Sequence, residues 1–235
     1  MDELPHLVPR KISLGLKAIG VVFPGARRTT AQIHPYTEWW SVQNQAAVRG
    51  DGPLLVGIGD SILVGIGASH PSISLLGLVG EALSQRDGRR WRVINLAIPG
   101  ARVDDALERQ LPLVEQVGTV DQFFCCIGTN DIVWTPALQS LRAGLRSVSD
   151  ALPPGTVFGP VAGASQRARL ANRALREQAR INGQLVAPIW NSEHPSKLRD
   201  RIASDRFHPN DLGYSVMADV VMNTLSGAPT DRESQ

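Results

Sequence analysis

The sequence predicts an α/β protein, a three-layer α/β/α sandwich with a central parallel sheet. Short apolar runs recur from residue 53 onward, amphipathic helical patterns separate them, and small or polar residues follow their ends. Continuous apolar strands that alternate with amphipathic helices indicate a parallel sheet covered by helices on both faces. With 235 residues, 43% of them hydrophobic, the chain can bury one sizeable core.

The first 50 residues are expected to form an arm and a lead-in helix that pack on this domain. Residues 12–23 are moderately apolar, but Lys17 and several glycines interrupt them. A signal peptide or membrane anchor needs an uninterrupted apolar run. The sequence therefore predicts a cytoplasmic protein, with membrane-surface contact the minority interpretation of this stretch. Residues 27–32 are interpreted as a linker and residues 34–47 as a helix.

The domain itself is expected over residues 51–226. Its strands are predicted at residues 54–58, 93–96, 123–127 and 157–161, with a weaker fifth pattern at 185–190. Leucines and valines at helical spacing predict helices over residues 75–83, 103–114 and 138–148, and a last helix follows Asn210 or Asp211 as its cap. The polar tail, residues 227–235, is expected to be disordered.

Charge and cysteine content exclude several classes of protein. Lys and Arg number 24 and Asp and Glu 22, so a net charge of +2 gives no reason to expect nucleic acid as a partner. Cys125 and Cys126 are adjacent, and on a strand they would point to opposite faces, which argues against a mutual disulfide. The sequence has neither a zinc-ligand pattern nor a phosphate-binding loop, so neither a zinc site nor a nucleotide phosphate site is expected.

Candidate functional residues follow the predicted strands. Ligand sites of open parallel sheets lie beyond the carboxyl ends of the strands. Ser61 follows the first strand, Gly100 the second and Asn130 the third, whereas His208 precedes the last helix and has Asp205 three residues before it. Each motif alone is also typical of a turn or a helix cap, but four complementary motifs together favour a site.

These residues can divide the work of a serine nucleophile among them. His208 can accept the Ser61 proton as a general base, and Asp205 can hold the imidazole tautomer. The oxyanion donors would be the backbone N–H groups of Ser61 and Gly100 and the side-chain amide of Asn130.

The same motifs resemble the sequence blocks of the SGNH (GDSL-type) hydrolase superfamily. They are Gly59-Asp60-Ser61, Gly100, Gly128-Thr129-Asn130-Asp131 and Asp205-x-x-His208, in that order. The resemblance runs from about residue 53 to residue 225, and the region around Trp39, Trp40 and Asn44 is similar to actinobacterial members. It implies a flavodoxin-like fold, no metal or organic cofactor, and hydrolysis of esters or thioesters through an acyl-serine.

Two departures from the family pattern are visible. Leu63 stands where members often carry a small polar residue, and Ala97-Ile98-Pro99 replaces a common Gly-x-Ser. Both could reshape the acyl pocket, for which Trp134 is the one candidate residue. Asp60 and Asp131 are interpreted as structural hydrogen-bond acceptors.

The expected function is that of a serine esterase whose partner is a small-molecule ester with a small or medium acyl group. A carbohydrate O-deacetylase and a lysophospholipase or thioesterase of the same superfamily are the enzymatic alternatives. From another class, a catalytically silent binding module would keep the fold. The sequence leaves the oligomeric state open.

Overall fold

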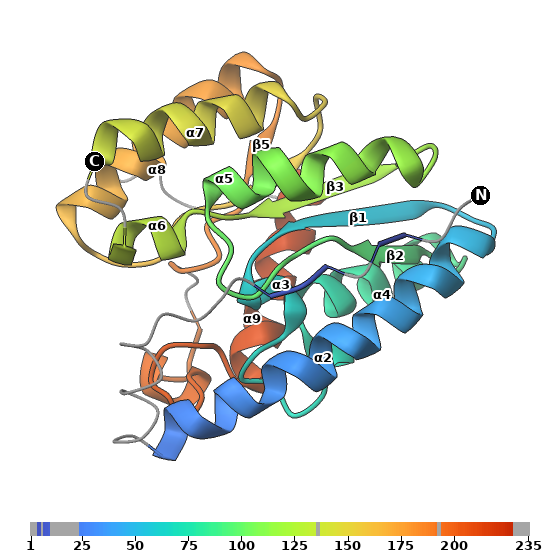
Figure 1. The fold of residues 1–235 in the computed structure, drawn as a ribbon, viewed down its shortest axis with the longest axis horizontal. Coiled ribbons are helices and arrows are strands. Elements are labelled where there is room, and N and C mark those ends of the chain that lie inside the picture. The colour runs from blue at the N-terminus through green and yellow to red at the C-terminus, as the bar shows by residue number, and fades with distance from the viewer. Residues whose placement is uncertain (1–3, 6, 10–23, 135–136, 192–193, 228–235) are drawn as a thin grey trace.

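A five-stranded parallel sheet forms the centre of the protein, in the order β2-β1-β3-β4-β5 (Figure 1). The computed structural model describes residues 4–5, 7–9, 24–134, 137–191 and 194–227. The strands are β1 (Leu54–Gly59), β2 (Arg92–Asn95), β3 (Gln122–Cys126), β4 (Val157–Gly159) and β5 (Leu185–Val186). The predicted strands are all present, although β5 is shorter than expected because Pro188 cannot donate to the ladder.

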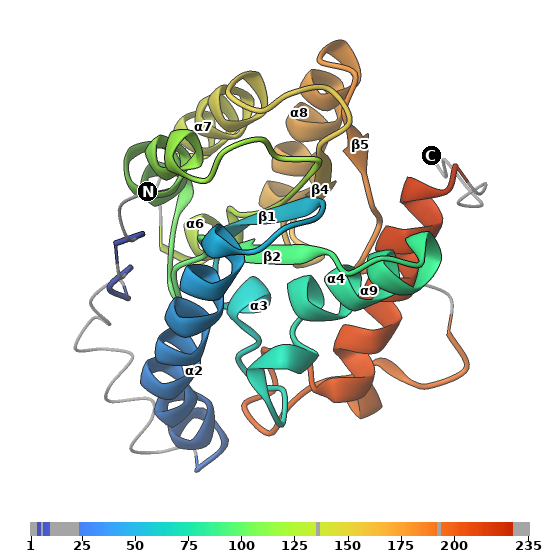
Figure 2. The same cartoon turned by 90° about the vertical axis from the view of Figure 1, so that its right-hand side faces the viewer.

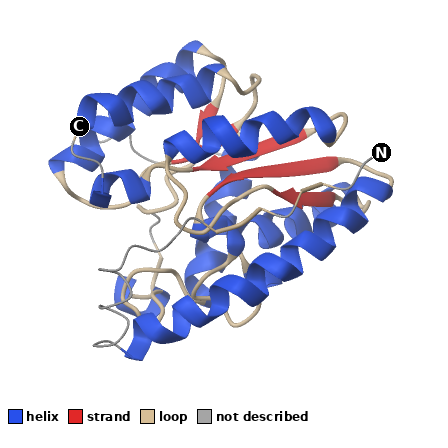
Figure 3. Cartoon of the chain, viewed as in Figure 1, coloured by secondary structure: helices blue, strands red, loops and turns tan. Residues whose placement is uncertain are grey.

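Helices cover both faces of this sheet, which confirms the predicted α/β/α class (Figures 2 and 3). One face carries α4 (Leu75–Asp87) and α9 (Asp211–Leu225). The other carries α7 (Leu138–Asp150), α8 (Gln166–Ile181) and the continuous segment α5 (Val103–Asp105), η2 (Ala106–Gln110) and η3 (Leu111–Gln116). Shorter elements are α3 (Ser61–Val64), η1 (Pro71–Ile73), α6 (Thr129–Trp134) and η4 (Leu198–Arg201).

The predicted helix over residues 103–114 is divided in the structure. Its α-helical start passes into a π-helical turn at Ala106–Gln110 and then into a 3₁₀-helix. Pro112 stands in the first turn of that 3₁₀-helix, where its missing N–H carries no cost.

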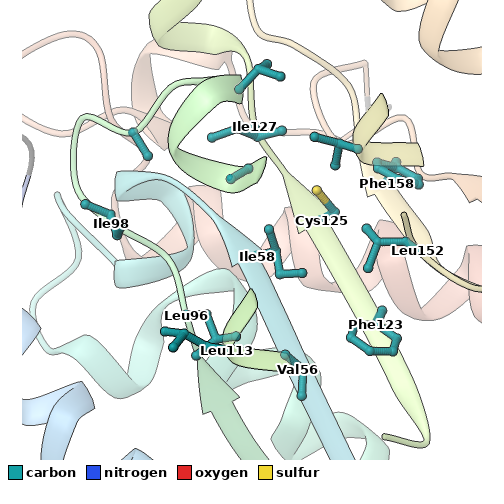
Figure 4. Packing of buried hydrophobic residues seen from close by; sticks show 14 of the residues in the cluster. Val56, Ile58, Leu96, Ile98, Leu113, Phe123, Cys125, Ile127, Leu152 and Phe158 are labelled. Carbon is teal, nitrogen blue, oxygen red and sulfur yellow. The ribbon is translucent and has the colours of Figure 1, made fainter. Parts of the chain in front are cut away.

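Alternating side chains of the strands build two hydrophobic clusters, one on each face of the sheet. Val56 and Ile58 point to the α7–α8 face and Leu55 to the α4–α9 face. Figure 4 shows the first cluster, where Ile58 lies near Cys125. Cys125 and Cys126 belong to different clusters and are free, as their alternation on a strand predicts.

The N-terminal helix differs from the prediction. Helix α2 spans Pro24–Arg49, so the interpretation of residues 27–32 as a linker is wrong. These residues carry little apolar periodicity, and tertiary contacts such as those of Gln32 with Gly67 and Ala68 override their weak local pattern. Residues 12–23 and most of the polar tail lie outside the described residues. None of the described helices has the length and apolar character needed to cross a membrane.

Candidate active site

Strand β1 delivers Ser61 to the carboxyl edge of the sheet. Asp60 has an extended backbone and caps α3, its Oδ1 accepting the N–H of Ile62 at 3.0 Å. Ser61 is therefore the first residue of α3, where a backbone N–H has no partner within the helix. A Cβ on Gly59 would lie 2.4 Å from the carbonyl oxygen of Cys126, so this close approach of β1 and β3 requires glycine.

Two distant aromatic side chains hold the end of this turn. Trp40 of α2 donates its Nε1–H to the carbonyl of Val64 at 3.1 Å. Tyr214 of α9 donates its hydroxyl to the carbonyl of Ile66 at 2.7 Å and is fully buried. Carbonyls at the end of a helix need such outside partners. The turn that carries Ser61, residues 60–66, is thus bound to helices near both ends of the described chain.

The His208 segment, residues 202–209, is a short hairpin before α9. Ile202 and Pro209 form its antiparallel bridge, and the N–H of Ala203 donates to the carbonyl of His208 at 2.8 Å. Arg206 has a left-handed backbone with φ of 59°, unusual for a residue other than glycine. Asn210 caps the following helix by accepting the N–H of Gly213, one of the two caps that the sequence predicts.

Asp205 holds His208 through both of its carboxylate oxygens. Oδ2 accepts from His208 Nδ1 at 2.6 Å, and Oδ1 accepts the backbone N–H groups of Phe207 and His208, each at 3.0 Å. Partial burial opposes ionisation, but the hydrogen bond and charge of His208 and these two N–H groups lower the pKa of Asp205 to about 2. Asp205 is therefore an ionised acceptor at neutral pH, which leaves the proton on Nδ1.

Ser61 and His208 meet although 147 residues separate them. The distance from Ser61 Oγ to His208 Nε2 is 2.9 Å. With the proton on Nδ1, Nε2 presents its lone pair, so the Ser61 hydroxyl donates to it. The structure thus brings the three predicted residues Ser61, His208 and Asp205 into one continuous hydrogen-bonded chain.

Asn130 contacts the residue before Ser61 and the residue after Gly100. Its Nδ2 donates to the carbonyl of Ala101 at 2.9 Å and makes a longer contact of 3.4 Å with Asp60 Oδ2. The first contact places the turn of Gly100, which has a φ of 79°, beside the first turn of α6. The segments carrying Asn130, Asp60 and Gly100 therefore converge at the edge where the sequence predicts them.

Asp60 is a buried carboxyl with a raised pKa, which the sequence does not reveal. Burial is the largest influence and raises the pKa of this carboxyl to about 6; nearby Asp131 adds to the rise, and the Ile62 N–H and His208 oppose it. Asp131 accepts the N–H of Val103 at 3.1 Å, in agreement with its interpretation as a structural acceptor.

Gln110 is a further residue that sequence reasoning missed. Its side chain is fully buried, and both ends of its amide bind one residue. Oε1 accepts the Gly59 N–H at 2.8 Å, and Nε2 donates to the Gly59 carbonyl at 2.9 Å. Gln110 thereby fixes the backbone two residues before Ser61. The only sequence signal is a glutamine within an apolar helical pattern.

The remaining candidates are less central. Trp134 is the last residue of α6, and its side chain lies outside the described part of the structure. Phe207 is 49% exposed and packs edge-on against the His208 ring with a centroid distance of 4.9 Å. Among the described residues, no group of three or more His, Cys, Asp or Glu side chains could hold a metal ion.

A parallel α/β/α sheet with a hydroxyl, an imidazole and a carboxylate aligned at its carboxyl edge defines a hydrolase-type fold and site. The comparison with protein families makes the assignment specific. The model of the GDSL-like Lipase/Acylhydrolase family matches residues 58–216, and the chain belongs to this family. It is accordingly an ester-hydrolysing type of enzyme.

Solved structures share the fold at low sequence identity. Esterase EstA from Pseudoalteromonas sp. has a TM-score of 0.62 and 14% identity, over 75% of this chain and 98% of that one. TesA has a TM-score of 0.62 and 19% identity, over 75% and 99%. A family 3 carbohydrate esterase of Clostridium thermocellum has a TM-score of 0.62 and 14% identity, over 75% and 96%. No curated protein matches the chain.

Proposed function

We propose that this protein is a serine esterase that hydrolyses carboxylic esters with small or medium acyl groups through an acyl-serine. The observation that carries the proposal is the hydrogen-bonded chain from Ser61 Oγ to His208 Nε2, at 2.9 Å, and from His208 Nδ1 to Asp205, at 2.6 Å. A serine hydroxyl needs an adjacent base to become a nucleophile, and the base needs a group that orients it.

In the acylation step, Ser61 Oγ attacks the ester carbonyl carbon while its proton passes to His208 Nε2. The tetrahedral intermediate then collapses, the bond from carbon to the leaving oxygen breaks, and Nε2–H protonates the departing alcohol. Asp205 stays ionised throughout and stabilises the imidazolium. For deacylation, water attacks the acyl carbon while Nε2 takes its proton. The bond from the acyl carbon to Ser61 Oγ then breaks, Nε2–H returns the proton to Oγ, and the acid is released.

The negative charge on the carbonyl oxygen needs donors that are already in place. We propose the N–H groups of Ser61 and Gly100 and the amide of Asn130 for this role. One Asn130 N–H is engaged with Ala101 at 2.9 Å, whereas the contact with Asp60 at 3.4 Å is long for a hydrogen bond. The proton facing Asp60 is therefore the one we assign to the oxyanion.

An apolar cavity beside the His208 segment is our candidate for the acyl site, although Ser61, His208 and Asn130 do not line it. It measures about 150 Å³ and is lined by Trp190, Ile202, Phe207 and Pro209 among others, so it adjoins both neighbours of His208. A cavity of about this size holds a molecule as large as benzene. If the acyl chain enters it, turnover should fall for chains beyond about six carbons.

The direct test is hydrolysis of p-nitrophenyl acetate, butyrate and octanoate by the wild type and by Ser61→Ala, with circular dichroism to verify folding. We expect turnover by the wild type only, and labelling of Ser61 by a fluorophosphonate. Wild-type protein that neither hydrolyses any of these esters nor reacts with the probe would favour a catalytically silent binding module.

Related activities use the same chemistry, and substrate panels separate them. A carbohydrate O-deacetylase would prefer acetylated sugars over p-nitrophenyl butyrate. A lysophospholipase or thioesterase would prefer long acyl chains or acyl thioesters.

We also propose kinship with actinobacterial members, because the lead-in region around Trp39, Trp40 and Asn44 resembles theirs.

A further inference from the structure

Helix α2 lies outside the family match, which begins at residue 58, yet it reaches the segments that hold His208. Figures 1 and 2 show its first turns beside the loop that precedes α9. Three of its residues, Gly25, Gln32 and Tyr36, contact the His208 segment or the segment after α3. They make α2 more than a cover for the edge of the sheet.

The central contact is made by Gln32. Its Oε1 accepts the N–H of Gly67 at 2.8 Å, and its Nε2 donates to the carbonyl of Ala68 at 2.8 Å. Tyr36, one turn further along α2, donates its hydroxyl to the same Ala68 carbonyl at 2.8 Å. Two peptide groups of the segment after α3, those on either side of the Gly67–Ala68 peptide bond, are therefore bound to α2.

That segment lies directly against His208. A Cβ on Gly67 would be 2.9 Å from His208 Cβ and 2.3 Å from the carbonyl oxygen of Pro209, so the two backbones are in close contact. Gly67 also has a φ of 99°, which favours glycine. Because Gln32 accepts the N–H of the same residue, Gly67 contacts both α2 and the His208 segment.

The start of α2 contacts the opposite end of the His208 segment. A Cβ on Gly25 would be 2.0 Å from the carbonyl oxygen of Ser204 and 2.9 Å from the backbone nitrogen of Asp205. Helix α2 thus contacts the chain before Asp205 directly and the chain behind His208 through Gly67.

We propose that Gln32 is a positioning residue for His208: through Gly67 and Ala68 it sets the depth of the imidazole relative to Ser61. This inference rests on the proposed function, in which His208 is the base. Loss of the Gln32 contacts would let the segment behind His208 relax, and a displacement of about 1 Å can cost about 100-fold in rate. Because the side chain of Gln32 is engaged with Gly67, Ala68 and Tyr36, we expect KM to change little.

The test compares Gln32→Met with Gln45→Met. Gln45 lies on the same helix and also donates its Nε2–H to a backbone carbonyl, that of Leu4 at 2.8 Å. This hydrogen bond does not involve the segments that contact His208. Gln32→Met loses the hydrogen bonds to Gly67 and Ala68 and the one to Tyr36, and Gln45→Met loses the one to Leu4. kcat and KM are measured with p-nitrophenyl butyrate, melting temperatures by circular dichroism, and the ring proton shifts of His208 by NMR, assigned with His208→Gln.

We expect Gln32→Met to lower kcat by about tenfold or more with KM within twofold, and to shift the His208 ring resonances. Gln45→Met should leave both unchanged. Gln32→Glu, which keeps the acceptor for the Gly67 N–H, should recover part of the loss.

A Gln32→Met variant with wild-type kcat and unshifted His208 resonances would overturn the proposal, whatever its melting temperature. The NMR arm needs no turnover. If the wild type cleaves no ester, the proposed function fails, while the His208 shifts still decide whether Gln32 positions the ring.

Discussion

Replacement of Asp205 by asparagine should prevent His208 from acting as a base without disturbing the hairpin of residues 202–209. In the native structure Oδ1 accepts two backbone N–H groups, those of Phe207 and His208. Only an oxygen can accept them, so the amide oxygen of Asn takes this position. The amide nitrogen then replaces Oδ2 and faces His208 Nδ1, at a site where the native distance is 2.6 Å.

This orientation reverses the tautomer of the neutral imidazole. Nδ1 must accept the amide proton, so the ring proton moves to Nε2, which then faces Ser61 Oγ as a donor instead of an acceptor. Serine proteases with the equivalent replacement lose about 10⁴-fold in kcat. We expect a similar loss here, which corresponds to about 5 kcal/mol of activation free energy.

The assay is kcat for p-nitrophenyl butyrate, with circular dichroism to verify that Asp205→Asn folds. Asp200→Asn is the matched control: this carboxylate is half exposed, and its ion pair with Arg199 is a surface contact. It should retain wild-type kcat. A folded Asp205→Asn protein with kcat within tenfold of the wild type would refute the assignment of His208 as a base oriented by Asp205.

Three further predictions concern the surroundings of Ser61. Asn130→Ala should lower kcat by about 10² to 10³ if its amide binds the oxyanion; an unchanged kcat in a folded variant would remove Asn130 from the mechanism. Gln110→Leu leaves a Gly59 N–H without its partner, which should lower stability by about 1–3 kcal/mol and also lower kcat. The control is Gln184→Leu, at another buried glutamine that binds backbone carbonyls, which should lower stability without lowering kcat. Equal kcat values for the two variants, measured at urea concentrations where both are folded, would contradict the role of Gln110. Asp60→Asn removes a buried carboxyl whose pKa is raised to about 6. Between pH 4 and 6 the native protein keeps a proton that the unfolded chain releases, so wild-type stability falls as pH rises through this range. Urea unfolding should therefore show little difference at pH 4 and an advantage for Asp60→Asn of up to about 3 kcal/mol at pH 7.5; an equal advantage at both values would mean that ionisation is not its cause.

The sequence predicts the sheet well because buried parallel strands are local signals. The run from Leu54 to Ile58 is apolar without interruption, since both faces of β1 are covered. The site residues follow for a related reason: the carboxyl ends of parallel strands meet at one edge, so Ser61 and Asn130 had to lie close together.

What the sequence misses is decided by tertiary contact. Gln110 and Gly59 are 51 residues apart, and Gln32 and Gly67 are 35 apart, so no local pattern identifies their hydrogen bonds. The first turns of α2 lack apolar periodicity, so no local pattern predicts them either. Instead they contact a segment far along the chain, where Gly25 closely approaches Ser204.

The hydrogen bond from Tyr214 to Ile66 joins residues 148 positions apart, and it has a consequence for biosynthesis. As the chain leaves the ribosome, Ser61 emerges 147 residues before its histidine, and the helix that anchors its turn follows later still. Products of interrupted translation that end before residue 205 carry the serine without its base. They should be inert toward cellular esters, so that chemical competence appears only after the His208 segment has been translated.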